Sequence, residues 1–496
     1  MNAAIIFTLL IVLMLTGMPV SISLGLTVLT FLFTMTHVPT TSVALKLFTG
    51  IENFNIMAIP FFILAGNFLT QGGVAKRMIN FTVTLVGHFY GGLALAGVLA
   101  CGLFAAISGS SVATVVAIGS IIMPAMIKAG YPKRFGAGVI TTSGSLGILV
   151  PPSIVLVLYS VSTNNSVSDM FIAGIVPGAV LLVMLSLTTW WIARKNNYPR
   201  VHLFENRSFA QETGQAFWGL LVCLSMTLLP PLPVVWALQE WTGSLFFGVT
   251  LSFLVWLPIA NKIAKRTTLG LAFEAASVWR AYWDSLWGLL LIAVVLGGIW
   301  SGVFTPTEAA ATAAVYAFFI VVFVYKDLPL TSIRKVLIDS AATSAMLLYI
   351  ITNAVLFSFL MTNENIPQAM ADWLTGAGFG PLTFLAVVNI LLLVAGNVME
   401  PSSIVLVLAP ILYPMAVKLG IHPIHFGVMM MVNMEVGLCH PPVGLNLYVG
   451  SGIANMGISE LTIAVLPWLG TMMVFLLMVT YWPALSLWLP HLMHGI

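Results

Sequence analysis

Two short polar segments interrupt apolar runs of this chain, and their oxygen atoms could bind a small cation. The first is residues 108–111, SGSS, and the second is residues 397–403, NVMEPSS. Each precedes a further apolar run that is itself broken by glycine and proline, at residues 144–152 and 437–446. If these runs cross a bilayer, non-helical backbone persists only where protein buries it or where it lines a cavity for an ion or substrate. The four interruptions therefore predict binding sites at membrane depth.

The chemistry of such segments fits a hard cation, of which sodium is one. Sodium prefers oxygen ligands, and these are supplied by carbonyl groups freed where a helix unwinds and by serine or threonine hydroxyls, without adding charge. A break of this kind can instead be a kink that eases helix packing. Because a polar tip is paired with a break twice in the chain, ion binding is favoured over that alternative.

Other polar residues in the apolar runs have more than one possible role. Glu400 and Glu435 are acids at apparent membrane depth, which by default suggests function, but each could equally satisfy backbone N–H groups freed at a break. His440 has no potential metal ligand at helical spacing except its neighbour Cys439, so no metal site beyond sodium and no cofactor is predicted. The motif FTPTE at residues 304–308 could act as a gate or as a structural brace.

The two halves of the chain repeat each other at one spacing. Six residues recur, with the same identity, 290 positions later. The pairs are Pro124 and Pro414, Lys128 and Lys418, Gly130 and Gly420, Gly147 and Gly437, Pro151 and Pro441, and Pro152 and Pro442. Interrupted apolar segments at corresponding places in two halves are typical of secondary transporters, whose site lies at the repeat interface.

Composition places the chain in a membrane. Of its 496 residues, 60% are hydrophobic and only 7% are charged, whereas soluble domains carry about 25% charge. The mean hydropathy is +1.06. The net charge of +3 comes without a basic or aromatic-basic face, so nucleic acid is not an expected partner. An all-α polytopic protein in a lipid bilayer is predicted.

Apolar runs predict the membrane spans. We expect them at residues 3–33, 54–69, 135–160, 170–193, 217–238, 245–260, 287–302, 309–325, 340–361, 426–453 and 461–489. The first is expected to be one retained span interrupted at residues 17–19, because the N-terminus lacks the positive charge of a secretory signal. Residues 78–88 are predicted to be an interfacial connector and residues 363–372 a polar loop.

Residues 91–127 are better explained as a re-entrant hairpin. Arms of 16 or 17 residues flank the tip at residues 108–111, and at ~1.5 Å per residue each arm falls short of a ~30 Å hydrocarbon core. A second hairpin has its tip at residues 397–403. Each hairpin is followed by a broken transmembrane helix.

The positive-inside rule sets the orientation. If Lys76 and Arg77 are cytoplasmic, counting crossings puts most other basic residues on that side, and the first hairpin then enters from the cytoplasm and the second from the opposite face. These basic residues are Lys128, Lys133, Arg134, Arg194, Lys195, Lys262, Lys265, Arg266, Lys326, Arg334 and Lys335. Two inverted-topology repeats are therefore predicted.

At this point the chain resembles a known family, the large membrane subunit of tripartite ATP-independent periplasmic (TRAP) transporters. The motifs that carry the resemblance are SGSSVAT (108–114), GILVPPS (147–153), GVFTPTEAA (302–310), EPSS (400–403) and HPPVGLNLYV (440–449). The resemblance implies the ion-transporter fold, with a scaffold and an elevator (transport) domain made of both hairpins and both broken helices. It also implies sodium coupling, a small membrane subunit, and an extracytoplasmic solute receptor that delivers a small carboxylate.

The resemblance also implies site residues. The first sodium site would consist of Ser108, Ser111, Gly147, Val150 and Pro152. The second would consist of Asn397, Glu400, Ser402, Gly437, His440 and Pro442, with His440 standing where many relatives have threonine. Candidates for substrate contacts are Ser110, Ser145, Ser403 and Asn446.

Domain boundaries follow the hairpins. Residues 1–90 are expected to be scaffold helices and a connector, 91–160 the first hairpin and broken helix, 161–379 scaffold, 380–453 the second hairpin and broken helix, and 454–496 a C-terminal scaffold helix. The family usually has a short connection where this chain inserts residues 217–266. That insertion is expected to be an extra helical hairpin.

The predicted function is sodium-coupled import of a carboxylate across a bacterial inner membrane. The GLCHPPVGLNLYV version of the second break looks most like members that handle C4-dicarboxylates, with sialic acid and other organic acids open. A stand-alone sodium- or proton-coupled carrier or antiporter that needs no receptor is the alternative. An enzyme is not expected, because the sequence lacks G-x-S-x-G, H-E-x-x-H and P-loop motifs.

Overall fold

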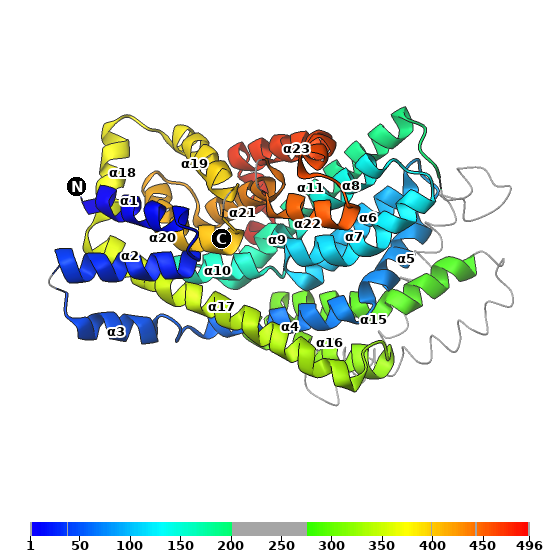
Figure 1. Ribbon diagram of the computed structural model, residues 1–496, viewed down its shortest axis with the longest axis horizontal. Coiled ribbons are helices and arrows are strands. Elements are labelled where there is room, and N and C mark those ends of the chain that lie inside the picture. The colour runs from blue at the N-terminus through cyan, green and yellow to red at the C-terminus, as the bar shows by residue number, and fades with distance from the viewer. Residues whose placement is uncertain (1, 37, 201–274, 398, 442–443, 495–496) are drawn as a thin grey trace.

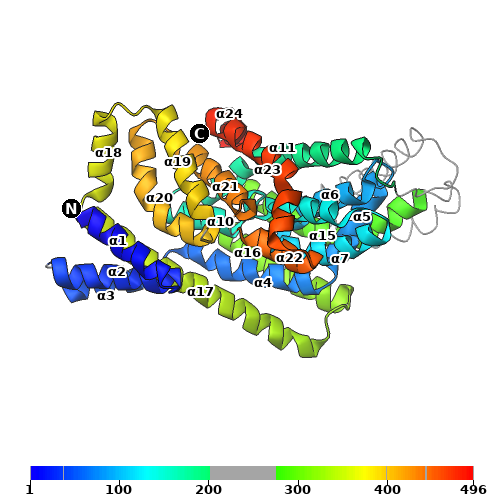
Figure 2. The same cartoon turned by 45° about the horizontal axis from the view of Figure 1, so that its top comes forward.

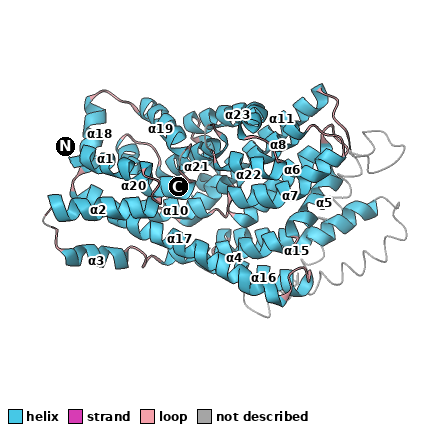
Figure 3. Ribbon diagram, viewed as in Figure 1, coloured by secondary structure: helices cyan, strands magenta, loops and turns pink. Residues whose placement is uncertain are grey.

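The structure is a computed structural model that describes residues 2–36, 38–200, 275–397, 399–441 and 444–494. These residues form helices, turns and loops, without strands (Figure 3). The extra hairpin predicted at residues 217–266 lies outside the described residues. Nine helical segments of the described chain are long and apolar enough to cross a membrane, the longest being Leu330–Asn363. The prediction of an all-α, multi-pass membrane protein is confirmed.

Helices of the first half are α1 (Asn2–Leu15), α2 (Val20–Met35), α3 (Thr40–Thr49), η1 (Phe54–Met57), α4 (Ala58–Gln71), α5 (Val74–Val86), α6 (Gly92–Ser108), α7 (Ser111–Lys128), α8 (Lys133–Ser143), α9 (Leu146–Leu149), α10 (Ile154–Thr163) and α11 (Val167–Lys195). Those of the second half are α15 (Ala275–Trp300), α16 (Pro306–Phe319), η2 (Ile320–Val324), α17 (Leu330–Asn363), α18 (Ile366–Gly376), α19 (Pro381–Gly396), α20 (Pro401–Lys418), α21 (Pro423–Cys439), α22 (Leu445–Ala454), α23 (Ile458–Tyr481) and α24 (Ala484–His494).

Both helical hairpins are present. Helices α6 and α7 join through Gly109, whose φ of +59° is readily adopted only by glycine, and α19 and α20 join through residues 397–400. In Figure 1, α6 and α7 lie toward the right end of the molecule and α19 and α20 toward the left end, with α9 and α21 between them.

Both broken helices are present as well. After α8 and the single turn α9, the chain becomes extended at Val150, and helix resumes only at α10. Helix α21 continues through Gly437 and ends where His440 is extended, so this break starts three residues later than predicted. Proline at positions 151 and 441 explains why neither helix continues, because proline has no N–H for the helical ladder.

The spacing of 290 positions recurs in the helix boundaries. Helix α7 begins at Ser111 and ends at Lys128, and α20 begins at Pro401 and ends at Lys418. The starts of α8 and α21 have the same spacing, and those of α10 and α22 and of α11 and α23 each differ from it by one residue.

The interruption predicted at residues 17–19 is present, and it divides the run at 3–33 into two helices, α1 and α2, because Gly17 takes a φ of +83° and Pro19 is the N-cap of α2. Two other predicted elements were wrong in detail. Part of the predicted polar loop at 363–372 is helical, since α18 is amphipathic and turns Ile366 inward. The closing run at 461–489 is divided into α23 and α24 before Pro483, which has no N–H to continue the helical ladder.

The long helix α17 lies along one side of the molecule. It packs against α2, α3 and α4 as well as α20 (Figure 2). Helix α23 packs against α8, α11 and α21, and its Trp468 is buried, with the indole N–H donating to Thr189 Oγ1 at 2.9 Å.

Gly138 is predicted to be required for the contact of α8 with α23. A Cβ atom there would lie 2.6 Å from both the Ala464 carbonyl oxygen and the Trp468 ring. Because backbone and a hydrogen-bonded indole cannot move aside easily, Gly138→Ala should destabilise the fold by roughly 1–3 kcal/mol and lower the midpoint of thermal unfolding in detergent.

The matched control is Gly470→Ala, on α23. A Cβ atom at Gly470 would meet nothing within 4 Å in the described structure, so this variant should be as stable as the parent or slightly more stable. Equal midpoints for the two variants would contradict the close packing at Gly138.

Candidate functional site

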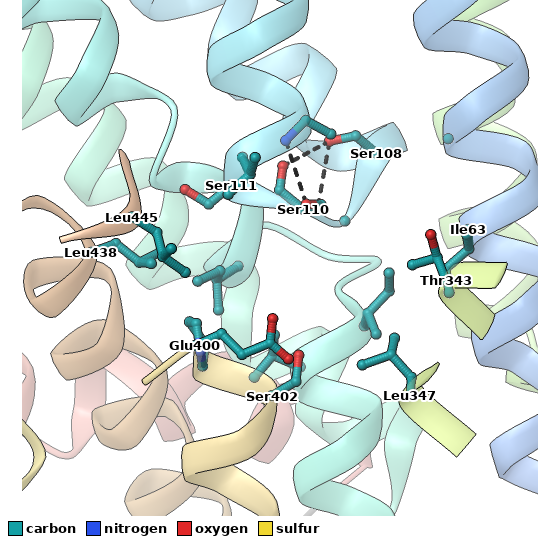
Figure 4. Close-up of a pocket in the computed structure, with 18 of the residues that line it drawn as sticks. Ile63, Ser108, Ser110, Ser111, Thr343, Leu347, Glu400, Ser402, Leu438 and Leu445 are labelled. Carbon is teal, nitrogen blue, oxygen red and sulfur yellow. Dashed lines mark hydrogen bonds between the residues drawn. The ribbon is translucent and has the colours of Figure 1, made fainter. Parts of the chain in front are cut away.

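The tips of the two hairpins meet at one cavity of about 200 Å³. Ser108, Ser110 and Ser111 line it from the first tip, and Glu400 and Ser402 line it from the second (Figure 4). Helices α4 and α17 supply Ile63, Thr343 and Leu347, and the broken helices also contribute, with Leu438 and Leu445 among the lining residues. Segments about 290 residues apart in sequence thus share one site.

Hydroxyl groups order the first tip. Ser110 caps α7, since its side chain accepts from the Ala113 N–H at 3.5 Å. Thr114 Oγ1 donates to the Ser110 carbonyl at 2.8 Å and lies 2.9 Å from Ser108 Oγ. These short-range contacts hold the backbone of the tip in a defined position.

The first tip packs directly on the first break, and glycine makes this possible. A Cβ atom on Gly147 would lie 2.5 Å from the Ser110 carbonyl oxygen, and one on Gly109 would lie 2.9 Å from the Pro152 carbonyl oxygen. Larger residues at either position would separate the two segments. The backbone of the first tip, at Ser110 and Ser111, therefore lies directly against Gly147, and Gly109 lies directly against Pro152. The side chain of Val150 packs toward Gly178 on α11. That the oxygens of these segments bind sodium stays a prediction.

The second break also reaches this site. Asn446, on the first turn of α22, is buried and donates from Nδ2 to Ser111 Oγ at 2.7 Å. In the described part of the chain, Asn446 Oδ1 and Ser153 Oγ are buried without hydrogen-bond partners. Buried oxygens are normally paired, so these two oxygens beside the first site are candidates to coordinate a cation.

The second predicted site is assembled in part. His440 Nδ1 lies 3.1 Å from Asn397 Oδ1, and Gly437 sits so close to Gly396 that a Cβ atom on Gly437 would lie 2.9 Å from the Gly396 Cα. Glu400 and Ser402 lie at the cavity instead. Pro442 lies outside the described residues.

Of the four residues expected to contact substrate, one lines the cavity. Ser110 does so, whereas Ser145 is buried and donates to the Thr142 carbonyl at 2.6 Å. Ser403 is buried and donates to Glu400 Oε1 at 3.5 Å, and Asn446 is held by Ser111. Their contacts with substrate stay predictions.

Two polar residues that line the first cavity were not predicted from the sequence. Asn67 on α4 and Thr343 on α17 line the cavity, and Asn67 Nδ2 donates to Ser340 Oγ at 2.8 Å. An asparagine within an otherwise apolar span is the available signal, but it does not say which site the residue faces.

The two ambiguous acid motifs now have structural roles. Glu435 is fully buried, and its Oε1 accepts from the Leu149 N–H at 3.0 Å, so it satisfies a backbone group freed at the first break. Glu308 and Thr305 form a reciprocal capping box at the start of α16, which stabilises the start of that helix; a role of the motif in gating stays a prediction. Among the described residues, no cluster of histidine, cysteine and acidic side chains could hold a metal ion.

Replacing Glu435 tests its structural role. Glu435→Gln retains an acceptor oxygen of similar shape, so its thermal stability should stay near that of the parent. Glu435→Leu leaves the buried Leu149 N–H without a partner and should cost roughly 1–3 kcal/mol, measured as a lower unfolding midpoint. If Glu435→Leu unfolds at the temperature of the parent, Glu435 does not brace the first break.

Comparisons with known proteins identify the family. The profile of "Tripartite ATP-independent periplasmic transporter, DctM component" matches residues 7–485. The C4-dicarboxylate TRAP transporter large permease protein DctM of Rhodobacter capsulatus is 58% identical, over 99% of this chain and 100% of that protein. The protein of the same name from Pseudomonas aeruginosa is 46% identical, over 91% of this chain and 89% of that protein.

A solved structure supports the fold alone. The YdaH transporter of Alcanivorax borkumensis, described as having an unusual topology, has a TM-score of 0.52 to this structure at 15% identity, covering 93% of this chain and 90% of that chain. Together with the apolar helices, the family match places the chain in the bacterial inner membrane as a secondary transporter and not an enzyme. The chain belongs to the family of large permease (DctM) components of tripartite ATP-independent periplasmic transporters.

Proposed function

We propose that this protein imports a C4-dicarboxylate into the cell, driven by sodium. The observation that carries the proposal is the cavity where both hairpin tips meet, with unpaired buried oxygens beside it. The substrate class rests on the names of the relatives that are 58% and 46% identical. The cavity is bounded by apolar helices and so can separate a small solute from lipid.

Sodium would bind at the first tip. Its candidate ligands are the carbonyl groups of the tip and the break, the Ser111 hydroxyl, and Asn446 Oδ1. All are neutral oxygens, which suit a hard cation. The second site, around Asn397 and His440, has a histidine ring nitrogen 3.1 Å from the Asn397 side-chain oxygen and would bind a second sodium ion with lower affinity.

An elevator motion is proposed for transport. Helices α6 and α7 lie toward one end of the molecule and α19 and α20 toward the other (Figure 1), and both tips line one cavity, which is the arrangement expected of two inverted repeats. The hairpins and broken helices contact one another through Gly147, Gly437 and Asn446, and would move as one body along the scaffold wall formed by α4 and α17. Such a motion would expose the cavity to each side in turn.

Two further components complete the proposal. The family description is tripartite, so the chain is expected to work with a small membrane subunit and an extracytoplasmic receptor that delivers the substrate. The alternative is a stand-alone carrier, which would transport without a receptor.

Uptake into proteoliposomes tests the function. With an inward sodium gradient, the large and small subunits should accumulate labelled succinate only when a cognate receptor is present. Uptake without the receptor would favour the stand-alone carrier, and uptake that ignores the sodium gradient would overturn sodium coupling.

Ser111→Ala tests the first ion site. The change removes one hydroxyl oxygen and leaves the backbone of the tip intact. Losing such a group costs roughly 1–3 kcal/mol, so the sodium concentration for half-maximal uptake should rise about tenfold to a hundredfold. The stabilisation of the purified protein by sodium in thermal unfolding should weaken in parallel.

Ser120→Ala is the control on the same helix. Ser120 Oγ donates only to the Ala117 carbonyl in the described structure and lies away from the tip, so sodium dependence should be that of the parent. Superimposable sodium curves for Ser111→Ala and the parent would remove Ser111 from the site.

A further inference from the structure

A second cavity, of about 380 Å³, lies between α3, α10, α17 and α20. Small-molecule sites typically have volumes of ~300–1,000 Å³, so it can hold a small solute. Its lining includes Lys46, Ser162, Ser358, Thr362 and Pro410. It is distinct from the cavity at the hairpin tips, and nothing described so far gives it a role.

The first and second cavities are lined by the same three helices, α10, α17 and α20. We call the boundary between these helices, from one cavity to the other, the seam. On α20, Ser402 lines the first cavity, whereas Leu406 and Pro410, four and eight residues later, line the second. Residues four apart share one face of a helix. The face of α20 that borders the first cavity therefore also borders the second.

Helices α17 and α10 repeat this arrangement. On α17, Thr343 and Leu347 line the first cavity, and Ile351 lines the second at the next spacing of four. On α10, Ile154 lines the first and Leu158 the second. Each of the three helices α10, α17 and α20 therefore has one face that borders both cavities. The seam between these faces runs from the first cavity to the second.

Charge distinguishes the two cavities. Lys46 is the only charged side chain among the described residues that line the second cavity, and Glu400 is the only one among those that line the first. The Lys46 ammonium lies 5.6 Å from the centre of the Phe359 ring, which places it against α17 at the cavity wall.

Lys46 is not neutralised by a neighbour. Of the carboxylates in the described structure, none lies within ion-pair distance of Lys46, whereas Lys418 pairs with Asp372. Two side-chain amides add hydrogen-bond donors to the lining. Asn53 uses its oxygen to accept from the Asn55 N–H at 3.0 Å, and the NH₂ groups of Asn53 and Asn164 have no acceptor among the described residues. A cation and free donors together suit an anion.

We propose that the second cavity is an anion-binding vestibule in which Lys46 holds a carboxylate group of the substrate before it passes along the seam to the hairpin tips. The ligand class is a small dicarboxylate, with one carboxylate on Lys46 and the other within reach of the amide donors. The vestibule rests on the proposed function and its orientation, which puts α3 and the end of α17 on the extracytoplasmic side.

The test is the reactivity of a cysteine placed in the vestibule. Ser358→Cys is made in the full chain with Cys223→Ser, because Cys101 and Cys439 are buried. In sealed vesicles whose extracytoplasmic face is outward, impermeant methanethiosulfonates of opposite charge, sulfonatoethyl and trimethylammonioethyl, are added outside. The background protein without Ser358→Cys gives the blank rate.

The ratio of anionic to cationic reagent rates should fall about tenfold when Lys46→Met is added, because one unit charge acts on the two reagents in opposite directions. Lys46→Arg keeps the charge and should keep the ratio. Lys335→Met, at the opposite end of α17, removes an exposed lysine far from the cavity and should also leave the ratio unchanged.

Succinate should slow the modification of Ser358→Cys, and Lys46→Met should abolish this protection. An unchanged reagent ratio in Lys46→Met, or equal protection by acetate at the same carboxylate concentration, would overturn the vestibule. Receptor-dependent uptake measured on the same proteins separates this result from the proposed function. If Lys46→Met leaves the reagent ratio unchanged while the parent takes up succinate, the vestibule is wrong and the proposed function stands. If Lys46→Met lowers the ratio but the parent takes up no succinate, the anion site is supported and the proposed substrate is wrong.

Discussion

Backbone that leaves the helix at membrane depth must find partners for its N–H and C=O groups, and this constraint organises the centre of the protein. The first hairpin tip meets it by packing on the first break, with Gly147 against the Ser110 carbonyl. Glu435 reaches across from α21 to accept the Leu149 N–H, and Asn446 reaches from α22 to Ser111. The second half of the chain thus supplies a partner for backbone of the first break and a contact to the first tip, and these contacts join the first hairpin to both broken helices.

The two halves share helix boundaries but not chemistry. At the spacing of 290 positions, Ser111 at the start of α7 corresponds to Pro401 at the start of α20, and Glu435 corresponds to Ser145. The first tip therefore offers hydroxyls, and the second offers a carboxylate at Glu400. In the proposed function, the different side chains at the two tips would give two ion sites of unequal affinity.

The sequence predicted the elements that depend on local signals. Glycine and serine within apolar runs marked both hairpin tips and both breaks, because those residues are unusual in a spanning helix. It missed α18, whose signal is amphipathic rather than apolar, and the separation of α23 from α24, where a proline lies inside an apolar run. For the candidate substrate residues, the direction in which each side chain points from its helix axis decides whether it lines the cavity, and sequence does not give this direction. Ser145 and Ser403 are adjacent in sequence to cavity segments yet are buried behind them, and Asn67 reaches the cavity from a distant helix that no local pattern connects to the tips.

The charges of the first cavity bear on how transport would be coupled. In the proposed function, a dicarboxylate entering it would meet Glu400 and no lysine or arginine among the described lining residues. Moving an anion from water into such a site is strongly unfavourable unless an opposite charge accompanies it. In the proposed mechanism sodium provides that charge, because its ligands at the tip and the break are neutral and leave the positive charge of the ion uncompensated. Substrate would then bind well only after sodium, and sodium would be held best when substrate is present, since coupling between two ligands is reciprocal. A permanent cation in the cavity would remove this dependence, which gives a physical reason for a lysine to lie at the outer end of the seam rather than at the hairpin tips.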